Sequence, residues 1–362
     1  MKTIAAAIAT AMFTWCLGSA AALGDGIMLA KMGVLEANAV SEESQEAIIV
    51  FHDARTAKEA VEDLILKVRV DGSVEEFAWV IPLPGEPAIA KADAELFDEL
   101  FEYVKFRKLQ RLKASHKKKF GGMGGMGAAG VDVLDRQVVG SYDTAVVKEK
   151  TPGALNEWLD REGYRRIGGG EDLIADYREK DYVFVCVKVS DAALKAAEPV
   201  DLHPLHFRFK TGGRDGIYYP MRITGLQDEP FDVNLYVFYR FWLNDDLNRY
   251  GYTHRGMTLN YRDWDGPRCV PNAGKRWAAP RRDAFLRDAA GKITRVADFL
   301  REHYPRSRFY LTNLRATDLD PEEVRQWPDD LWLFPYYLDR QQVPQDARAG
   351  GPAAGAYRPA GG

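Results

Sequence analysis

Two aspartates in the segment YRDWDGPRC have a spacing that acid–base chemistry can use. Asp263 and Asp265 flank Trp264, and the turn residues Gly266 and Pro267 follow. Two carboxylates beside an aromatic ring are suited to holding a carbohydrate or to general acid–base hydrolysis. Acidic residues in an exposed turn explain the same pattern. Asp263 and Asp265 are therefore the candidate catalytic residues of a hydrolase, and a solvated turn is the alternative.

The histidines show no spacing that favours a metal site. His203 and His206 are three residues apart, but Pro204 lies between them and residues 205–210 alternate as a strand. That alternation places His206 and Arg208 on the outward face. A metal would also need further ligands, and no nearby spacing supplies them. We therefore predict no metal site.

Other motifs that carry chemistry are missing from the sequence. Gly168, Gly169 and Gly170 precede a predicted helix, yet no phosphate-binding lysine follows and the spacing fits no nucleotide fingerprint. Neither a G-x-S-x-G nor an H-E-x-x-H segment is present. The sequence therefore predicts no cofactor, and the three glycines indicate a flexible connection.

Cysteine is rare, with 3 residues in the whole chain. Cys16 lies in the N-terminal apolar segment, so Cys186 and Cys269 are the pair that could form a disulfide in an oxidising compartment. Cys186 lies inside the apolar run YVFVCVKV, where cysteine also serves as a small buried hydrophobe. Both alternatives stay open, and a hydrophobic core must provide most of the stability.

Residues 1–22 have the pattern of a cleavable secretory signal peptide. Lys2 supplies a positive charge, residues 4–17 contain no charged side chain, and residues 20–22 are the small alanines that signal peptidase prefers. The apolar stretch is shorter than the roughly 20 residues that span a bilayer. Trp15 before the first cysteine disfavours lipid attachment. We expect an exported protein, periplasmic or secreted, and a buried N-terminal helix is the alternative.

The charge and the apolar runs of the remaining chain give no reason to expect nucleic acid binding or a membrane span. The net charge of −4 and the pI near 6.0 give no electrostatic reason to expect nucleic acid binding. No apolar run after residue 22 approaches the length of a membrane span, so we predict none after signal cleavage. The hydrophobic content of 46% is sufficient for a substantial core.

The first part of the mature chain predicts a β-meander followed by a long helix. Strands are predicted at residues 47–51, 64–70 and 77–81. Asp71 and Gly72 form the turn before the third strand, and Pro82 is expected to end it because proline cannot donate to a sheet ladder. Residues 93–113 repeat apolar side chains at steps of three and four, which predicts an amphipathic helix.

The later part predicts a second α+β region. Strands are predicted at residues 143–147, 182–189, 205–210, 219–224, 233–241 and 309–314. Helices are predicted to start at Thr151 and Pro152 and stop at Gly163, and to cover residues 171–178 and 293–303. The apolar run 182–189 is typical of a central strand that is covered on both faces.

These elements divide the chain into five predicted parts. They are a signal peptide at 1–22, a β-meander plus long helix at 23–120, a Gly/Met-rich flexible loop at 121–130, a second α+β region at 131–340 and a disordered tail at 341–362. Strands that follow one another closely usually pair antiparallel. The predicted fold class is α+β, with largely antiparallel sheets, a few packed amphipathic helices and one or two closely associated domains.

Tyrosine and tryptophan are frequent between residues 218 and 277. Such side chains line interfaces and ligand grooves, and they also fill the cores of β-rich proteins. Core packing is our preferred interpretation, and an aromatic groove is the alternative.

Several segments together resemble the bacterial exported proteins of the domain-of-unknown-function family 2330. They are FAWVIPLPGEP (77–87), LNEWLDREGY (155–164), DLIADYREKDYVFVCVKV (172–189), LHPLHFRFKTGG and YYPMRITG (202–225), and FYLTNLRATDLDPEEV (309–324). The chain departs from the family in having no cysteine soon after the signal peptide. Arg165 also follows Tyr164 where the family often has a proline. The resemblance implies export and one shared fold, and it implies no activity and no catalytic residues.

The preferred functional hypothesis is an extracytoplasmic binding or scaffold module at the cell envelope, with an unidentified envelope or extracellular partner. The alternative is an extracytoplasmic hydrolase that uses acidic residues such as Asp263 or Asp265. The first is preferred because no motif supplies a nucleophile, a base and a residue that orients the base.

Overall fold

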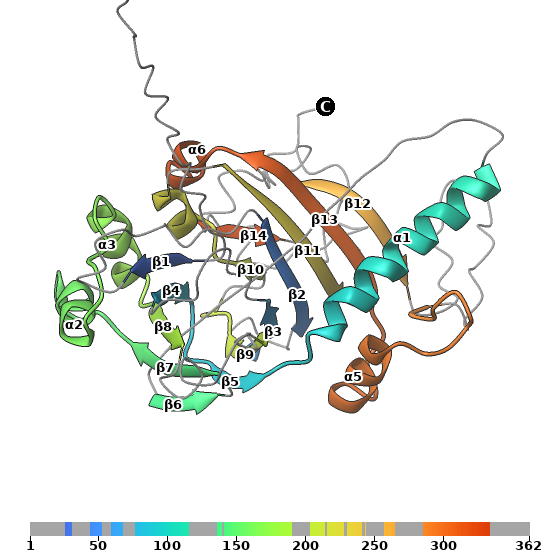
Figure 1. The fold of residues 1–362 in the computed structure, drawn as a ribbon, viewed down its shortest axis with the longest axis horizontal. Coiled ribbons are helices and arrows are strands. Elements are labelled where there is room, and N and C mark those ends of the chain that lie inside the picture. Colours follow the sequence, from blue (N-terminus) through green and yellow to red (C-terminus); the bar gives the residue numbers. More distant parts are fainter. Residues whose placement is uncertain are drawn as a thin grey trace, which may run out of the picture.

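The computed structural model describes residues 26–30, 44–52, 59–67, 77–115, 136–139, 141–189, 203–213, 216–227, 230–240, 243, 257–264 and 285–333. Their strands form a 7-stranded sheet, a 5-stranded sheet and a 2-stranded ribbon. Helices lie outside the two large sheets (Figure 1). The structure confirms the predicted α+β class.

The larger sheet has the strand order β12-β13-β11-β2-β3-β9-β5. In that order the strands are β12 (Thr258–Trp264), β13 (Tyr310–Leu319), β11 (Phe231–Tyr239), β2 (Ser44–His52), β3 (Val61–Leu66), β9 (Leu205–Lys210) and β5 (Ala88–Lys91). β2 and β11 run parallel, and the other neighbouring pairs are antiparallel. The sheet is therefore assembled from distant parts of the chain.

The smaller sheet has the order β1-β4-β8-β7-β6 and is antiparallel throughout. In that order the strands are β1 (Ile27–Ala30), β4 (Phe77–Leu83), β8 (Val183–Val189), β7 (Tyr142–Val147) and β6 (Arg136–Val139). β8 is the central strand, as its apolar run predicts. The ribbon pairs β10 (Ile217–Tyr219) with β14 (Leu331–Leu333).

The described helices lie around the two sheets. They are α1 (Glu95–Ser115), α2 (Ala154–Glu162), α3 (Glu171–Glu179), the 3-10 helix η2 (Arg222–Leu226), α5 (Arg295–His303) and α6 (Pro321–Arg325). Figure 1 shows α1 and α5 along the larger sheet and α2 and α3 beyond the smaller one. The residues of α1 and α5 pack with one face of the larger sheet, whereas those of α2 and α3 join the core that includes the smaller sheet.

Alternation along the central strands separates two cores. Ala47 and Ile49 of β2 belong to the core between the two sheets, and Ile48 and Val50 belong to the core under α1 and α5. Successive side chains of a strand point to opposite faces, so one strand serves both cores. Each fully buried aliphatic side chain of this kind contributes about 1.5–3 kcal/mol.

The predicted β-meander is wrong in its third strand. β3 pairs with β2 and β9, whereas β4 joins the smaller sheet between β1 and β8. Pro82 also does not end β4, because the strand continues to Leu83 and Pro82 pairs with Phe184 of β8. β1 pairs only with residues 77–80, so the proline lies where β4 has a strand on one side only, a position that tolerates a missing donor.

Two other local predictions need correction. α2 begins at Ala154 and not at Thr151, because Gly153 takes a left-handed conformation with φ 86°. Gly163 does end the helix, with φ 88°. The predicted strand at 219–224 stops at Tyr219, since Pro220 cannot extend the ladder, and the chain turns into η2.

Some predictions fall outside the described residues. These include the signal peptide at 1–22, the Gly/Met-rich segment at 121–130, and the tail at 341–362. The division into two α+β regions stays a prediction, and strands of both regions share each sheet through the pairs β4–β8 and β3–β9. Among the helices that the structure describes, none combines the length and apolarity that crossing a membrane requires.

Candidate functional site

Asp263, the first candidate catalytic residue, lies buried between β12 and α1. Its carboxylate is 1% exposed and accepts hydrogen bonds from the hydroxyls of Tyr103 (2.7 Å) and Tyr261 (2.8 Å) and from Arg107 (3.2 Å). These contacts fasten the helix to the edge of the sheet. Asp265 lies outside the described residues, so the catalytic role of the pair stays a prediction.

The other residues considered from the sequence lie apart from one another. Cys186 is buried in the middle of β8, and Cys269 lies outside the described residues, so their disulfide stays a prediction. His203 contacts Pro204 and Ser141, whereas His206 contacts Asp63. Within the described ranges, no group of three or more His, Cys, Asp or Glu side chains could hold a metal ion.

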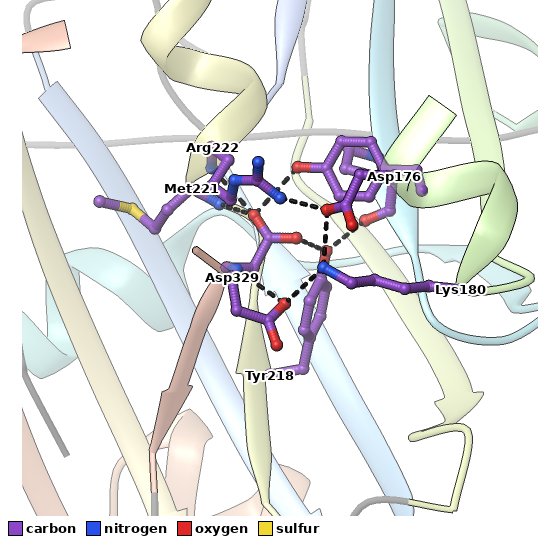
Figure 2. A network of polar contacts seen from close by, with 9 residues as sticks. Asp176, Lys180, Tyr218, Met221, Arg222 and Asp329 are labelled. Atoms are coloured by element: carbon purple, nitrogen blue, oxygen red, sulfur yellow. Dashed lines mark hydrogen bonds and ion pairs between the residues drawn. The ribbon is translucent and has the colours of Figure 1, made fainter. Parts of the chain in front are cut away.

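Asp330 forms the centre of a buried polar network. Figure 2 shows its neighbours Tyr218, Met221 and Arg222. It is 4% exposed and accepts hydrogen bonds from the hydroxyls of Tyr177 (3.0 Å) and Tyr218 (3.1 Å). It also accepts from the backbone N–H groups of Met221 and Arg222, each at 2.9 Å. One carboxylate thereby joins α3, β10, η2 and the residue that precedes β14.

The local sequence explains why this carboxylate is needed. β10 ends at Tyr219 before Pro220, and the first turn of η2 leaves backbone N–H groups without partners inside the helix. Buried donors of this kind must find an acceptor, and Asp330 supplies it. Burial raises the pKa of Asp330, and the two backbone N–H groups offset part of that rise.

A layer of charged side chains extends from this network. Arg222 forms an ion pair with Asp176, and Lys180 contacts Asp176 at 2.6 Å and Asp329 at 3.2 Å (Figure 2). Burial would raise the pKa of Asp176, but hydrogen bonds and charges from Lys180 and Arg222 outweigh it and lower the pKa. The guanidinium of Arg222 is therefore held in one position by a carboxylate that stays ionised.

Arg222 also lines an open cleft of about 680 Å³ between α3, η2 and α6. Five charged residues line it, namely Arg222, Arg325, Asp172, Asp320 and Glu322. Arg325 donates to the carbonyl of Gly169, so the glycine segment between α2 and α3 forms part of the wall. The Nε atom of Arg222 is buried and has no hydrogen-bond partner among the residues that the structure describes.

The walls of this cleft approach each other closely at two glycines. A Cβ atom on Gly225 would lie 2.5 Å from the backbone nitrogen of Arg325 and 2.7 Å from the carbonyl oxygen of Pro321. A Cβ atom on Gly170 would lie 2.6 Å from a methyl group of Leu226. At Gly225 the neighbouring atoms belong to the backbone, so only glycine allows the contact, and the cleft has a preformed shape there.

A second polar cluster lies on the other face of the larger sheet, under α5. Asp63 of β3 is fully buried and contacts His206 (2.7 Å), Arg208 (3.0 Å) and the hydroxyl of Tyr304. Burial would raise the pKa of Asp63, but hydrogen bonds from His206 and Tyr304 and the neighbouring positive charges lower it. The predicted outward placement of His206 and Arg208 is confirmed by the burial pattern of β9, in which Arg208 is exposed and His206 is partly covered by Phe299 of α5.

Glu62, the neighbour of Asp63, points into the core between the two sheets. Its Oε2 atom accepts from the backbone N–H of Tyr218 at 2.7 Å, and its buried Oε1 atom has no hydrogen-bond partner in the described part of the chain. Burial raises the pKa of this carboxyl well above its ordinary value, and the charge of Asp63 raises it further. The sequence signal was available, since Glu62 and Asp63 interrupt the apolar run of β3.

Replacing Glu62 with glutamine is expected to stabilise the protein at neutral pH by about 1–3 kcal/mol. The amide retains the acceptor for Tyr218 and removes a carboxyl whose ionisation burial opposes. Because the folded-state pKa is raised, this carboxyl weakens the fold as pH rises from about 4.3 through that pKa. The increase in the free energy of unfolding, measured by urea titration, should therefore be smaller at pH 4 than at pH 7.

The exposed Glu86 offers a matched control, and Glu86→Gln should change the free energy of unfolding little at either pH. If Glu62→Gln changed the free energy of unfolding equally at pH 4 and pH 7, the carboxyl of Glu62 would not have the raised pKa that its burial implies.

The fold and the site define an α+β protein with two packed sheets and a polar cleft at their border. Residues 26–324 match the family DUF2330, described as an uncharacterized protein conserved in bacteria, and the chain belongs to this family. No curated protein matches the chain. The crystal structure of baculovirus P35 is similar at 11% identity and a TM-score of 0.33, covering 81% of this chain and 97% of that one.

Proposed function

We propose that this protein acts after export as a binding module and that the cleft between α3, η2 and α6 receives its ligand. The observation that carries the proposal is the position of Arg222 in the cleft wall, where its guanidinium pairs with Asp176 and its backbone N–H donates to Asp330. A volume of about 680 Å³ is in the range of small-molecule sites. A preformed wall also lowers the entropy lost on binding.

The charges of the cleft indicate a ligand that carries both signs. Arg222 and Arg325 present planar donors that match a carboxylate. Asp172, Asp320 and Glu322 line the same space and can accept from an ammonium group. An amino acid or a short peptide with free ends has both groups, and we assign the cleft to this class.

Export is the second part of the proposal and rests on the sequence of residues 1–22. Expression of the full chain in a bacterial host should yield a protein whose mature N-terminus lies close to residue 23 and which leaves the cytoplasm. N-terminal sequencing of fractionated cells measures both. Recovery of the uncleaved chain in the cytoplasm would contradict this part without affecting the cleft.

The hydrolase alternative has weaker support among the described residues. Asp263 is buried against Tyr103, Tyr261 and Arg107, and it does not line the cleft. A binding role is therefore the better conclusion.

Titration calorimetry with trialanine tests the ligand class. We expect binding that N-acetylation or C-terminal amidation of the peptide weakens, since each removes one charge. Arg222→Gln should weaken binding at least about tenfold, the effect of losing roughly 1.4 kcal/mol. Arg222→Lys should also bind poorly, because an ammonium group lacks the planar fork of the guanidinium.

Arg295→Gln provides the control, because Arg295 is an exposed residue of α5 that does not line the cleft. Circular dichroism verifies that the variants fold. Arg325→Gln is a second variant for the binding measurement, and it leaves the ion pair between Arg222 and Asp176 intact. The absence of any heat of binding at millimolar peptide would overturn the assignment.

A further inference from the structure

A separate pocket of about 430 Å³ lies at the C-terminal end of α5. Four arginines line it, namely Arg287, Arg301, Arg306 and Arg308, and no acidic residue does. None of its lining residues lines the cleft beside Arg222. The two sites are therefore independent.

The four arginines differ in how they are held. Arg301 forms an exposed ion pair with Asp298 at 3.2 Å, and Arg287 donates to the carbonyl of Gly291 at 2.7 Å. Arg306 and Arg308 are exposed, and no hydrogen bond or ion pair joins them to another described residue. Two of the four guanidinium groups are thus available to a ligand as they stand.

Helix polarity does not account for this set of charges. Arg301 lies in the last turn of α5, where a cation favours the negative end of the helix dipole. Arg306 and Arg308 lie beyond the helix, and Arg287 precedes it. Like charges around one cavity repel each other, so the arrangement costs stability unless an anion enters.

Part of the pocket lining is buried. Leu300, Tyr304 and Phe309 are buried there, and the hydroxyl of Tyr304 donates to the fully buried Asp63. The rings of Tyr304 and Phe309 also meet edge to face at 5.8 Å. The segment that carries Arg306 and Arg308 is therefore anchored by a buried aromatic residue on each side.

We propose that this pocket binds a phosphate group. One carboxylate is satisfied by a single guanidinium fork, whereas a phosphate dianion or a phosphate ester offers several acceptor oxygens and more charge to several arginines. The volume admits a phosphate with a small substituent. A soluble phosphate and a lipid headgroup share this chemistry, and the experiment separates them.

The test uses the folded full chain with pyrophosphate in calorimetry and with vesicles in sedimentation. We expect binding of pyrophosphate, or of vesicles that contain phosphatidylglycerol in preference to vesicles of phosphatidylcholine alone. The first result assigns a soluble phosphate and the second a lipid headgroup. Raised salt should weaken either interaction, because Arg301, Arg306 and Arg308 are exposed.

The double variant Arg306→Gln/Arg308→Gln should lower the affinity at least about tenfold. The double variant Arg161→Gln/Arg165→Gln removes two exposed arginines elsewhere and should bind as the wild type does. Arg222→Gln should also leave phosphate binding unchanged, which separates this proposal from the peptide cleft. The proposal fails if neither probe binds, or if both double variants lose affinity equally.

Discussion

Replacing Asp330 with alanine is expected to destabilise the protein by about 3–5 kcal/mol. The side chain is 4% exposed, and its removal leaves the hydroxyl of Tyr177 and the N–H groups of Met221 and Arg222 without their acceptor. The hydroxyl of Tyr218 keeps the carbonyl of Pro82 at 2.8 Å as an acceptor. Each buried donor left without a partner costs about 1–3 kcal/mol, although water entering the cavity recovers part of this. Urea unfolding followed by circular dichroism measures the loss.

Three further variants divide the effect of Asp330. Asp330→Asn should cost less, since the amide keeps one acceptor oxygen. Tyr177→Phe should cost about 1 kcal/mol, because it removes one hydrogen bond to Asp330. Tyr218→Phe should cost at least as much, because its hydroxyl contacts both Asp330 and the carbonyl of Pro82. Asp98→Ala removes an exposed carboxylate of α1 and should change stability by less than about 0.5 kcal/mol. A loss of this small size for Asp330→Ala would show that the network is not needed to hold η2 against the sheets.

Replacing Asp63 with alanine is expected to cost about 3 kcal/mol at neutral pH. Asp63 accepts from His206, Arg208 and Tyr304, and it is fully buried. Arg208 is 47% exposed and can turn to solvent, whereas the hydroxyl of Tyr304 is buried and cannot. Most of the loss should therefore come from the contacts under α5.

Asp63 and its neighbour Glu62 should respond to acid in opposite directions. The lowered pKa of Asp63 means that its contribution is present above about pH 3.9 and is lost as pH falls through the folded-state pKa. The difference in the free energy of unfolding between the wild type and Asp63→Asn should thus become smaller from pH 7 to pH 3. Over the same range, the extra stability of Glu62→Gln relative to the wild type should be lost. If the difference in unfolding free energy between the wild type and Asp63→Asn did not change with pH, Asp63 would not be ionised in the folded protein.

Local patterns in the sequence were sufficient for several elements. The apolar run of β8 predicted a central strand, and the three- and four-residue repeat of α1 predicted its position within two residues at each end. The frequent tyrosines between 218 and 277 also belong to the core where they are described, as Tyr219, Tyr236 and Tyr239 show. These features depend on nearest neighbours and on periodicity, which the sequence displays directly.

The pairing of strands and the site depend on contacts that no local pattern contains. β4 does not pair with β3 as the meander predicted, because it pairs with β8, which lies 100 residues later in sequence and is buried from Val183 to Val187. Asp330 meets Tyr177 and Tyr218 across separations of 153 and 112 residues. The available hint was an acidic pair, Asp329 and Asp330, directly before an apolar strand. Such a pair indicates a buried carboxylate, but it does not show which residues donate hydrogen bonds to it.

The parallel pairing of β2 with β11 has a consequence for how the chain folds. Glu46 on β2 meets Asn234 on β11 across 188 residues, and Asp63 on β3 meets His206 on β9 across 143 residues. Topologies rich in such distant contacts have high contact order and fold slowly, because the entropy of closing long loops is lost before the contacts form. An N-terminal fragment that stops before β9 keeps only the β2–β3 hairpin of the larger sheet, and an isolated hairpin is marginally stable at best. Because of this strand order, we expect the larger sheet to form only when nearly the whole chain is present.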